Sequence, residues 1–544
     1  MHVVVIGGGI GGLTTALALH EAGIRATVLE RTREIRPLGV GINLQPHAVR
    51  ELTELGFADE LAAIGVPTAD MVWVDRSGNR LHREERGTAR GYRWPQYSVH
   101  RGELQMMLLA AVRERLGPGA VRTGTVFEHV RQHPDGVHVR AIGRETGEVT
   151  DITGDLLVGA DGLHSAVRAR LHPDEGPLRW SGTMMWRGVT ETDAFLTGRT
   201  MIHADAGRGA RLIAYPIRPG AAGRGRSLTN WVCMVSVAEP QPLDGAAGWN
   251  RVGRLEDVLP HFTDWELGWL DVPGMLAGGG ELLEYPMVDR DPLPSWGEGR
   301  VTLLGDAAHP MYPVGANGAS QAIVDARVLA YELATREDPV VALRAYEDKR
   351  RAATSAIVLA NRRMDRSKPR DPAHADGSGD GPAQGIYTKI ARTYRNSTGD
   401  DVAELNARAS LHPPIRKGNT GMTFKPEPTD VTSTYYAAWK VKDFDTLRSV
   451  LAETVDFVGP YGSATSADEF RAKIEVASEI NTDIVVKKVF SDGPDVLTWF
   501  EMHTSVAAPV QVATWSHVVD GKIARQRVAF DPRPITGQHS GRTA

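Results

Sequence analysis

The glycine-rich run Gly7 to Gly12 (GGGIGG) is the feature of this 544-residue chain that most restricts its fold. It follows a short apolar run, Val3 to Ile6, and precedes Leu13 to Ala22, where apolar residues recur at helical spacing. Ala26 to Glu30 then predicts a second strand. A strand, a glycine turn, a helix and a parallel strand form the opening unit of a doubly wound α/β domain. We therefore predict such a domain at the start of the chain.

The run fits the spacing G-x-G-x-x-G, and each glycine has a physical role in binding a dinucleotide. The first permits the tight turn, the second lets the backbone approach a pyrophosphate, and the third allows the helix to pack closely. The helix N-terminus offers free N–H groups and a partial positive charge to the phosphates. Glu30 stands where it can accept a hydrogen bond from a ribose hydroxyl. The predicted contacts here are Gly7, Gly9, Ile10, Gly11, Gly12, Glu30 and Arg31.

Two later segments favour FAD over a nicotinamide as the bound dinucleotide. Leu157 to Gly159 reads as a strand that ends at Asp161-Gly162, and Val301 to Leu304 as one that ends at Gly305-Asp306. An Asp at a strand-to-turn junction can bind a ribityl or ribose hydroxyl, and glycines let backbone N–H groups reach an isoalloxazine edge. The predicted contacts from these segments are Asp161, Asp306, Gly315, Asn317 and Gly318.

Composition limits the other function classes. The formal net charge of -5 provides no basic surface for nucleic acid or anionic lipid. The single cysteine, Cys233, excludes a disulfide framework or a thiolate metal site. No window has the ~20 apolar residues of a membrane helix, and the N-terminus lacks the features of a signal peptide. We expect a cytoplasmic protein that binds no metal, membrane or nucleic acid.

The length predicts more than one domain, because single cores stop growing at roughly 250 to 300 residues. We predict a first body over residues 1–397, with a β-rich insertion at about 180–290, and a linker over 398–428. Within that body, Lys368 to Pro382 has loop composition and Tyr387 to Arg395 predicts a helix. A separate domain is predicted over 429–534, followed by a tail over 535–544.

Residues 1 to about 396 resemble the FAD-dependent aromatic hydroxylases, the single-component class that includes p-hydroxybenzoate and salicylate hydroxylases, and are most similar to members that act on phenazines. The resemblance implies an α/β fold, with a Rossmann-like FAD-binding domain and an inserted substrate-covering sheet. The matching stretches are residues 34–43, 97–105, 185–191, 285–294 and 315–322.

The resemblance also implies the chemistry. NADH or NADPH reduces tightly, non-covalently bound FAD, O2 forms a flavin C4a-hydroperoxide, and one oxygen atom passes to an electron-rich ring. Arg101, Gln105 and Asp306 would contact FAD, and the Pro313 carbonyl would face the reacting oxygen. Arg168 would engage NAD(P)H or instead form an ion pair that ties its own turn. Because no second dinucleotide motif follows, the nicotinamide is expected to bind only transiently.

The substrate is expected to bind beside Arg211 and Tyr215. Relatives that hydroxylate phenols often carry His at the position of Arg211, and Arg cannot act as a base at neutral pH but can hold a carboxylate. A surface salt bridge for Arg211 and core packing for Tyr215 are the alternatives. His47 could act as an acid or base, or be an exposed or capping imidazole. Aromatic and methionine side chains that could form a flat slot are Met185, Trp186, Trp231, Tyr285 and Tyr312.

These features predict a monooxygenase that hydroxylates an aromatic or heteroaromatic, phenazine-like intermediate of secondary metabolism, with or without loss of a carboxylate. The alternatives are a Baeyer-Villiger-type or epoxidising flavoprotein acting on a polycyclic polyketide, and a flavin- or ligand-binding module without oxygenase activity.

Residues 429–534 resemble the polyketide-cyclase-like, nuclear-transport-factor-2-like domains, which are cone-shaped α+β folds and are often dimeric. The resemblance rests on residues 435–439, 456–460 and 521–525. An accessory role is expected, with a homodimer interface or a second catalytic step as options. Side chains that could line a pocket, or pack in the core or an interface, are Tyr436, Trp439, Tyr461, Trp499, His503, Trp515 and His517.

Overall fold

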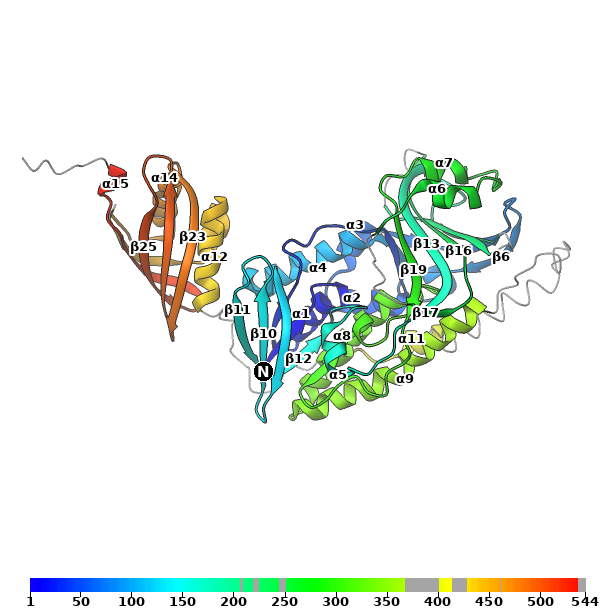
Figure 1. The fold of residues 1–544 in the computed structure, drawn as a ribbon, viewed down its shortest axis with the longest axis horizontal. Helices are drawn as coiled ribbons and strands as arrows, with labels where there is room; N and C mark the ends of the chain where they lie inside the picture. The colour runs from blue at the N-terminus through cyan, green and yellow to red at the C-terminus, as the bar shows by residue number, and fades with distance from the viewer. Residues whose placement is uncertain are drawn as a thin grey trace, which may run out of the picture. The chain divides into compact units, whose positions relative to one another are not determined.

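The computed structural model describes residues 1–205, 209–218, 225–243, 251–366, 401–412, 428–460 and 462–536 (Figure 1). The predicted loop at Lys368 to Pro382, the predicted helix at Tyr387 to Arg395, most of the predicted linker, and Tyr461 lie outside these ranges. The chain divides into two compact units. One comprises Met1–Arg115 and Val121–Lys417, and the other comprises Leu116–Ala120 and Gly418–Ala544.

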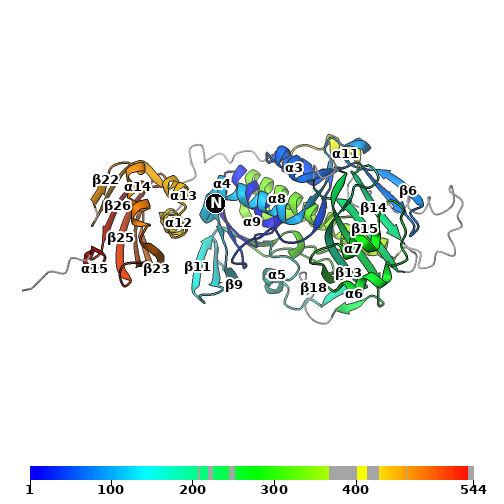
Figure 2. The same ribbon diagram turned by 90° about the horizontal axis from the view of Figure 1, so that it is seen from above.

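The first unit is built on a five-stranded parallel sheet with strand order β20-β12-β1-β2-β8. Its central strands are buried along most of their length, as expected for strands covered on both faces. Helix α1 packs against α8, and α9 runs alongside α8 (Figures 1 and 2). The bounds are β1 His2–Ile6, α1 Ile10–Glu21, β2 Arg25–Leu29, α4 Arg101–Leu116, β8 Val121–Arg122, β12 Leu156–Gly159, β20 Val301–Leu303, α8 Gly318–Thr335 and α9 Pro339–Arg366. The predicted doubly wound opening is confirmed.

A nine-stranded sheet forms the inserted layer, with strand order β18-β19-β13-β16-β15-β14-β5-β6 and β17 paired to β13. It extends beyond the predicted range of about 180–290, because β14 pairs in parallel with β5 from an earlier part of the chain. The bounds are β5 Asp70–Val74, β6 Arg80–Glu85, β13 Leu178–Asp193, β14 Thr200–Asp205, β15 Ala210–Pro216, β16 Arg226–Ser236, β17 Gln241–Leu243, β18 Arg251–Val252 and β19 Leu283–Asp289.

Two small antiparallel sheets complete the first unit, with orders β3-β7-β4 and β11-β10-β9. Alternate residues of β10 are buried, which is the pattern of a strand covered on one face. The bounds are β3 Gly41–Leu44, α2 Pro46–Glu54, α3 Ala58–Ile64, β4 Gly65–Thr68, β7 Gln96–His100, β9 Thr125–Gln132, β10 Val137–Gly143, β11 Val149–Gly154, α5 Ala166–Leu171, α6 Leu255–Val258, α7 Val272–Ala277 and α11 Val402–Ala407.

The second unit is an α+β domain, as predicted. Helices accompany a six-stranded sheet of order β22-β21-β26-β25-β24-β23, and aromatic side chains fill the core between the sheet and the helices. The bounds are α12 Pro428–Val441, α13 Phe444–Ser449, β21 Leu451–Gly459, β22 Gly462–Ala464, α14 Ala467–Ala477, β23 Asn481–Asp492, β24 Asp495–Thr504, β25 Val510–Val519, β26 Lys522–Ala529 and α15 Arg533–Thr536.

Candidate active site

Three turns that are far apart in the sequence meet at one edge of the parallel sheet. The glycine turn follows β1, Asp161-Gly162 follows β12, and Gly305-Asp306 follows β20. These strands are neighbours in the order β20-β12-β1 and run parallel, so their carboxyl ends lie together. Ligands of open α/β sheets bind outside this edge. The structure therefore brings the three predicted cofactor segments into one site.

The glycine turn is shaped to receive a phosphate. A Cβ added to Gly12 would lie 1.9 Å from the Gly7 carbonyl oxygen, whereas one added to Gly9 would meet no atom within 4 Å. Gly7 itself has a φ of 108°, in the region that favours glycine. Helix α1 begins with no capping side chain and no acidic residue in its first turn. No side chain therefore competes with a phosphate for the first N–H groups of Ile10 and Gly11.

Glu30 and Gln105 hold the backbone of this turn. The buried Glu30 carboxylate accepts hydrogen bonds from the Gly8 N–H at 2.7 Å and from the Thr32 N–H at 2.7 Å. The Gln105 side-chain amide donates to the Gly8 carbonyl at 2.8 Å. Both residues thus lie at the predicted site, as does the exposed Arg31. Their direct contacts with the cofactor stay predictions.

Arg101 and Asp306 lie near each other at the same edge. Both side chains are accessible to solvent, yet burial among protein atoms lowers the pKa of Arg101 and raises the pKa of Asp306. The charge of each residue opposes the shift of the other. A group that water reaches from one side, while protein surrounds it on the others, shows this combination. The pair fits a site for the polar middle part of FAD.

Asp161 has a structural role in its own turn. Its carboxylate accepts hydrogen bonds from the Ser165 hydroxyl at 2.5 Å and from the Ala166 and Val167 N–H groups at 2.7 and 3.3 Å. Burial raises the pKa of Asp161, and these hydrogen bonds oppose the rise. The residue shapes the turn before α5, and its predicted contact with the cofactor stays a prediction.

Arg168 ties the two acidic turns together. Its guanidinium forms a bidentate pair with Glu175 at 2.7 and 2.5 Å and donates to the carbonyls of Ala307 and Ala308 at 2.9 and 2.8 Å. The side chain is 2% exposed. Of the two roles considered for this residue, the structure shows the ion pair, because the buried guanidinium is not accessible to a nicotinamide.

We expect Arg168→Met to lower the free energy of unfolding by about 3–5 kcal/mol, since it leaves Glu175 and two carbonyls without their buried partner. Urea unfolding would measure the loss. Arg170→Met, an exposed position on the same helix, is the control and should change stability little. A fold-stable Arg168 variant with a raised KM for NAD(P)H would contradict this structural role.

The segment from Pro313 to Gly318 forms a strained turn before α8. Gly315 and Ala316 both have positive φ angles, 86° and 55°, and a left-handed alanine costs about 1–2 kcal/mol. The Pro313 carbonyl accepts a hydrogen bond from the Ala316 N–H at 3.1 Å, and the Gln45 amide donates to the Gly315 carbonyl at 3.3 Å.

The turn leads into α8 with the buried Asn317 at its N-cap position, but no side chain caps the helix and no acid lies in its first turn. Its positive end is therefore available to a partly anionic ring. The proposed interaction of the Pro313 carbonyl with oxygen stays a prediction.

One face of the nine-stranded sheet packs against this turn. Sulfur-containing, aromatic and aliphatic side chains form the cluster on this face, and we call it the methionine cluster. Three predicted pocket residues, Met185, Tyr285 and Tyr312, belong to it. Methionine side chains adapt to flat aromatic surfaces and contact them favourably through sulfur. The members are Met185, Val232, Met234, Tyr285, Met287, Tyr312 and Val314, with Ile213 and Met364 packed against them.

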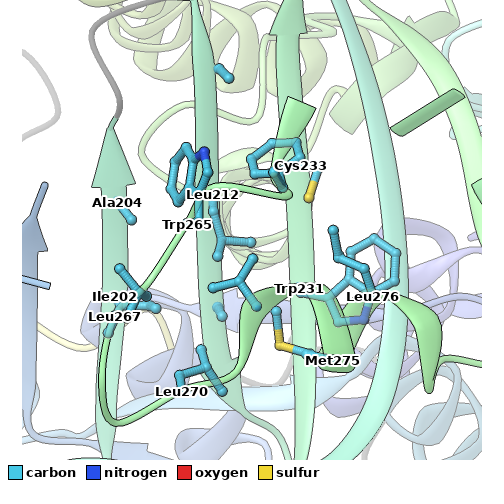
Figure 3. Close-up of a cluster of buried hydrophobic side chains, with 14 of the residues drawn as sticks. Ile202, Ala204, Leu212, Trp231, Cys233, Trp265, Leu267, Leu270, Met275 and Leu276 are labelled. Carbon is cyan, nitrogen blue, oxygen red and sulfur yellow. The ribbon is translucent and has the colours of Figure 1, made fainter. Parts of the chain in front are cut away.

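Trp186 and Trp231 do not lie in that cluster, so the prediction that they line the slot disagrees with the structure. Successive residues of a strand point to opposite faces, and these two indoles pack in the core on the other face of the sheet with α7. Figure 3 shows Trp231 in this core together with Met275 and Leu276 of α7. The Trp231 indole N–H donates to Thr190 at 3.0 Å, and that of Trp186 donates to Glu284 at 3.1 Å. Both are structural side chains.

Arg211 and Tyr215 lie on β15 and point to the same side as the methionine cluster, since their neighbours Ala210, Leu212 and Ala214 pack in the opposite core. Arg211 is 5% exposed and lies 3.0 Å from a carboxylate oxygen of Asp365. The salt bridge considered as an alternative is therefore present, but it is buried rather than on the surface. The Tyr215 hydroxyl donates to the Gly41 carbonyl at 2.9 Å.

Burial raises the pKa of Tyr215 to about 12, so its hydroxyl stays protonated through neutral pH. Stability that depends on this proton is lost only as the pH rises from about 10 through about 12.

We expect Tyr215→Phe to change KM by about 3- to 10-fold, the effect of one hydrogen bond. The pH profile of kcat/KM between 6 and 9.5 should keep its shape. An ionisation that appears in the pH profile of the parent enzyme but not in that of the Tyr215→Phe variant would contradict the neutral state of the Tyr215 hydroxyl.

His47 is buried between α2 and α8, so the alternative of an exposed imidazole is wrong. Its Nε2 lies 3.2 Å from the amide nitrogen of Gln321, whose oxygen accepts from Arg350 at 2.5 Å. Arg350 also donates to Asp325, which pairs with His309 at 2.6 Å. An imidazole nitrogen that accepts from an amide is unprotonated. His47 thus belongs to a buried network, and its role as an acid or base stays a prediction.

Sequence reasoning missed Arg187, the most unusual charged residue of this face. It lies two residues after Met185 on β13, and strand alternation places both on the same side. Its guanidinium donates to the Tyr285 hydroxyl at 2.7 Å and to the Gly41 carbonyl at 2.8 Å. Among the described residues, no carboxylate forms an ion pair with it. A half-buried cation without an acid is costly in the absence of a ligand, and the position of Arg187 in the stretch 185–191 gave no sign of this.

The second unit places its predicted pocket residues on two different faces. Tyr436 and Trp439 pack in the aromatic core. The side chains of Leu497, Trp499, Glu501 and His503 alternate with buried neighbours along β24 and point outward. Trp515 and His517 do the same on β25. The alternative of core packing is therefore found for Tyr436 and Trp439. The sheet separates Trp499, His503, Trp515 and His517 from that core, so these four do not share a pocket with the two core residues.

In the part of the chain that the structure describes, no group of three or more His, Cys, Asp or Glu residues could hold a metal ion. No helix of the same ranges is both long and apolar enough to cross a bilayer.

Comparisons with known families and proteins agree with this geometry. Residues 1–229 and 289–361 match the model of an FAD binding domain, and residues 432–526 match a SnoaL-like domain. The chain is 57% identical over 368 residues to phenazine 1,6-dicarboxylic acid hydroxylase PhzS of Lysobacter antibioticus, covering 67% of this chain and 89% of that protein.

Two further similar proteins are more distant. With 3-hydroxybenzoate 6-hydroxylase 1 of Aquipseudomonas alcaligenes the chain shares 33% identity, over 66% of this chain and 88% of the relative. The crystal structure of Klebsiella pneumoniae HpxO complexed with FAD and uric acid superposes with a TM-score of 0.58 and 27% identity, covering 74% of this chain and 97% of that one. The fold, with its FAD-binding layer and inserted sheet, is thereby confirmed.

Proposed function

This chain belongs to the FAD-dependent aromatic hydroxylases and carries a SnoaL-like domain at its C-terminal end. It is a flavoprotein monooxygenase whose cosubstrates are NAD(P)H and O2. From that premise we propose that it hydroxylates a flat, phenazine-like aromatic or heteroaromatic carboxylate of secondary metabolism, with or without loss of the carboxylate.

The observation that carries the proposal is Arg187 beside the methionine cluster. A half-buried guanidinium with no acidic partner among the described residues suits an anionic substrate, because a carboxylate would complete its two-pronged hydrogen bonding. The adjoining cluster presents polarisable side chains to a fused ring. The 57% identity to an enzyme named for phenazine 1,6-dicarboxylic acid supports the same class of substrate.

FAD, when bound, accepts hydride from NAD(P)H and activates O2 for transfer of one oxygen atom. The residues at the sheet edge fit this group: Gly9 and the uncapped start of α1 would hold the pyrophosphate, and Arg101 and Asp306 the polar chain beside it. On the substrate side, Arg187 would orient the ring, and the methionine cluster would exclude water from it. Tyr215 would remain a neutral hydrogen-bond donor.

The test is oxidation of NADH and NADPH by the FAD-loaded enzyme in the presence of phenazine-1-carboxylate, phenazine-1,6-dicarboxylate or the single-ring 3-hydroxybenzoate. We expect at least one of the two fused carboxylates to accelerate oxidation at least about tenfold more than 3-hydroxybenzoate. Mass analysis after reaction under 18O2 should show one labelled hydroxyl. A lactone or ester product would favour insertion of oxygen beside a ketone instead. No stimulation by any of the three would refute the proposed substrate.

For the second unit we propose an accessory role, with homodimerisation through the outer face of its sheet. Phe490, Leu497 and Trp499 are 55%, 42% and 44% exposed, and adjacent strands place them side by side, since Phe490 pairs with Leu497. Neighbouring exposed apolar side chains favour burial against a second copy. Light scattering of the full chain should show a dimer. The Trp499→Glu variant should be a monomer with unchanged hydroxylase activity, and a monomeric parent protein would refute the proposed dimer.

We also propose a cytoplasmic location.

A further inference from the structure

Two arginines of the substrate side differ in how their charge is compensated. Arg187 on β13 has hydrogen bonds to a hydroxyl and a carbonyl but no ion pair among the described residues. Its Nε is buried and has no hydrogen-bond partner there. Arg211 on β15 is neutralised by Asp365 at 3.0 Å. The face therefore holds one uncompensated cation and one neutral pair.

Asp365 reaches this face from the last turn of α9, which is anchored to the sheet by its neighbours. Asn361 donates to the Tyr312 carbonyl at 2.9 Å, Arg362 forms a bidentate pair with Asp289 at 2.7 and 2.8 Å, and Met364 packs on the methionine cluster. The carboxylate is thus held in place over the substrate side rather than free to turn into solvent.

The ion pair between Arg211 and Asp365 does not satisfy the hydrogen-bonding capacity of the two side chains. The two atoms lie within ion-pair distance, but the Arg211 nitrogen and the Asp365 oxygen are buried without a hydrogen-bond partner among the described residues. Both atoms therefore keep the capacity to interact with a polar group of a ligand, whereas their opposite charges cancel at longer range.

The sheet also sets the spacing of the two arginines. Arg187 pairs with Val232, Val232 pairs with Ile213, and Arg211 precedes Ile213 by two residues. With about 4.8 Å between strands and about 3.4 Å per residue along a strand, the two Cα atoms are about 12 Å apart. Arginines whose Cα atoms have that spacing can reach opposite ends of one fused-ring substrate.

We propose that Asp365 sets the number of carboxylates that this site accepts. Arg187 binds one carboxylate, and the neutral Arg211–Asp365 pair accepts an uncharged ring at the other end. A second carboxylate placed there would lie beside the Asp365 carboxylate, and two like charges at close range repel each other. The inference rests on the proposed function and narrows it to a monocarboxylate.

The experiment compares the dissociation constants of phenazine-1-carboxylate and phenazine-1,6-dicarboxylate, measured from the absorbance change of the FAD-loaded enzyme. We expect the parent enzyme to bind the monocarboxylate at least about tenfold more tightly. In Asp365→Asn the charge of Arg211 is no longer compensated. This variant should bind the dicarboxylate at least about tenfold more tightly than the parent enzyme does, so that the preference for the monocarboxylate is lost or reversed. The double variant Arg211→Gln/Asp365→Asn has neither charge, so the dicarboxylate should bind to it more weakly than to Asp365→Asn, which keeps the uncompensated cation of Arg211.

Asp291→Asn is the matched control, because Asp291 is also paired with arginines but is 53% exposed. It should leave the ratio of the two constants unchanged. Equal binding of the two compounds by the parent enzyme would overturn the proposal, and so would an unchanged ratio in Asp365→Asn with normal FAD content. Failure of both compounds to perturb the flavin of the parent enzyme would instead refute the proposed substrate class, and this inference with it.

Discussion

Arg187→Met should bind FAD normally and lose at least about 30-fold in kcat/KM for an aromatic carboxylate. Loss of one partner of a buried, hydrogen-bonded charge pair costs about 2–5 kcal/mol, and each 1.36 kcal/mol is tenfold in rate. The same substitution removes the hydrogen bonds to Tyr285 and Gly41. Steady-state kinetics, with the flavin content determined from the absorption spectrum, would measure the effect.

Two controls separate recognition of the carboxylate from a general disturbance. The methyl ester of the same substrate should lose less than about 3-fold, because it offers no charge to Arg187. Arg226→Met removes a half-exposed arginine of neighbouring β16 that pairs with Asp193, and it should leave kcat/KM unchanged. Equal losses for the acid and its ester would show that Arg187 only supports the fold.

Gly9→Ala should yield a folded, colourless protein whose affinity for FAD is lower by about 100-fold or more. A Cβ at this position meets no protein atom within 4 Å, so the substitution leaves the protein's own packing intact. The space it enters lies before the uncapped start of α1, where a pyrophosphate must approach the backbone. Isothermal titration of the apoprotein with FAD and thermal unfolding would test the two parts of this expectation.

Gly12→Ala provides the contrast within the same turn. Its Cβ would lie 1.9 Å from the Gly7 carbonyl oxygen, so the turn or α1 must move and the protein should lose stability even without FAD. Gly176→Ala, where an added Cβ meets nothing within 4 Å, serves as the neutral control. A Gly9→Ala variant that binds FAD as the parent does would refute the phosphate role of this turn.

The cofactor layer could be predicted from the sequence because its signals are local. Gly7, Gly9 and Gly12 are required by backbone geometry within one turn, and β1, α1 and β2 appear as contiguous patterns of apolar residues. Asp161-Gly162 and Gly305-Asp306 also read as strand ends. Parallel pairing of β20, β12 and β1 then brings these turns together, and that step follows from the general rule for open α/β sheets.

The substrate side could not be predicted residue by residue. Trp186 was expected in the slot and Arg187 was overlooked, although they are adjacent, because a strand sends neighbouring side chains to opposite faces and the sequence does not say which face meets the cofactor. The partner of Arg211 lies 154 residues further along the chain, at the end of α9. Such a pair leaves no pattern of spacing.

The amino-acid sequence by itself determined the FAD site, the family and the presence of two folded parts, since these depend on short motifs and periodicities. Only the tertiary structure decided how charge is distributed over the substrate side. It neutralised Arg211 with Asp365, left Arg187 without an acidic partner among the described residues, and used Arg168 to join two turns. The physical reason is that compensation of a buried charge depends on which distant residues the fold brings within a few ångströms.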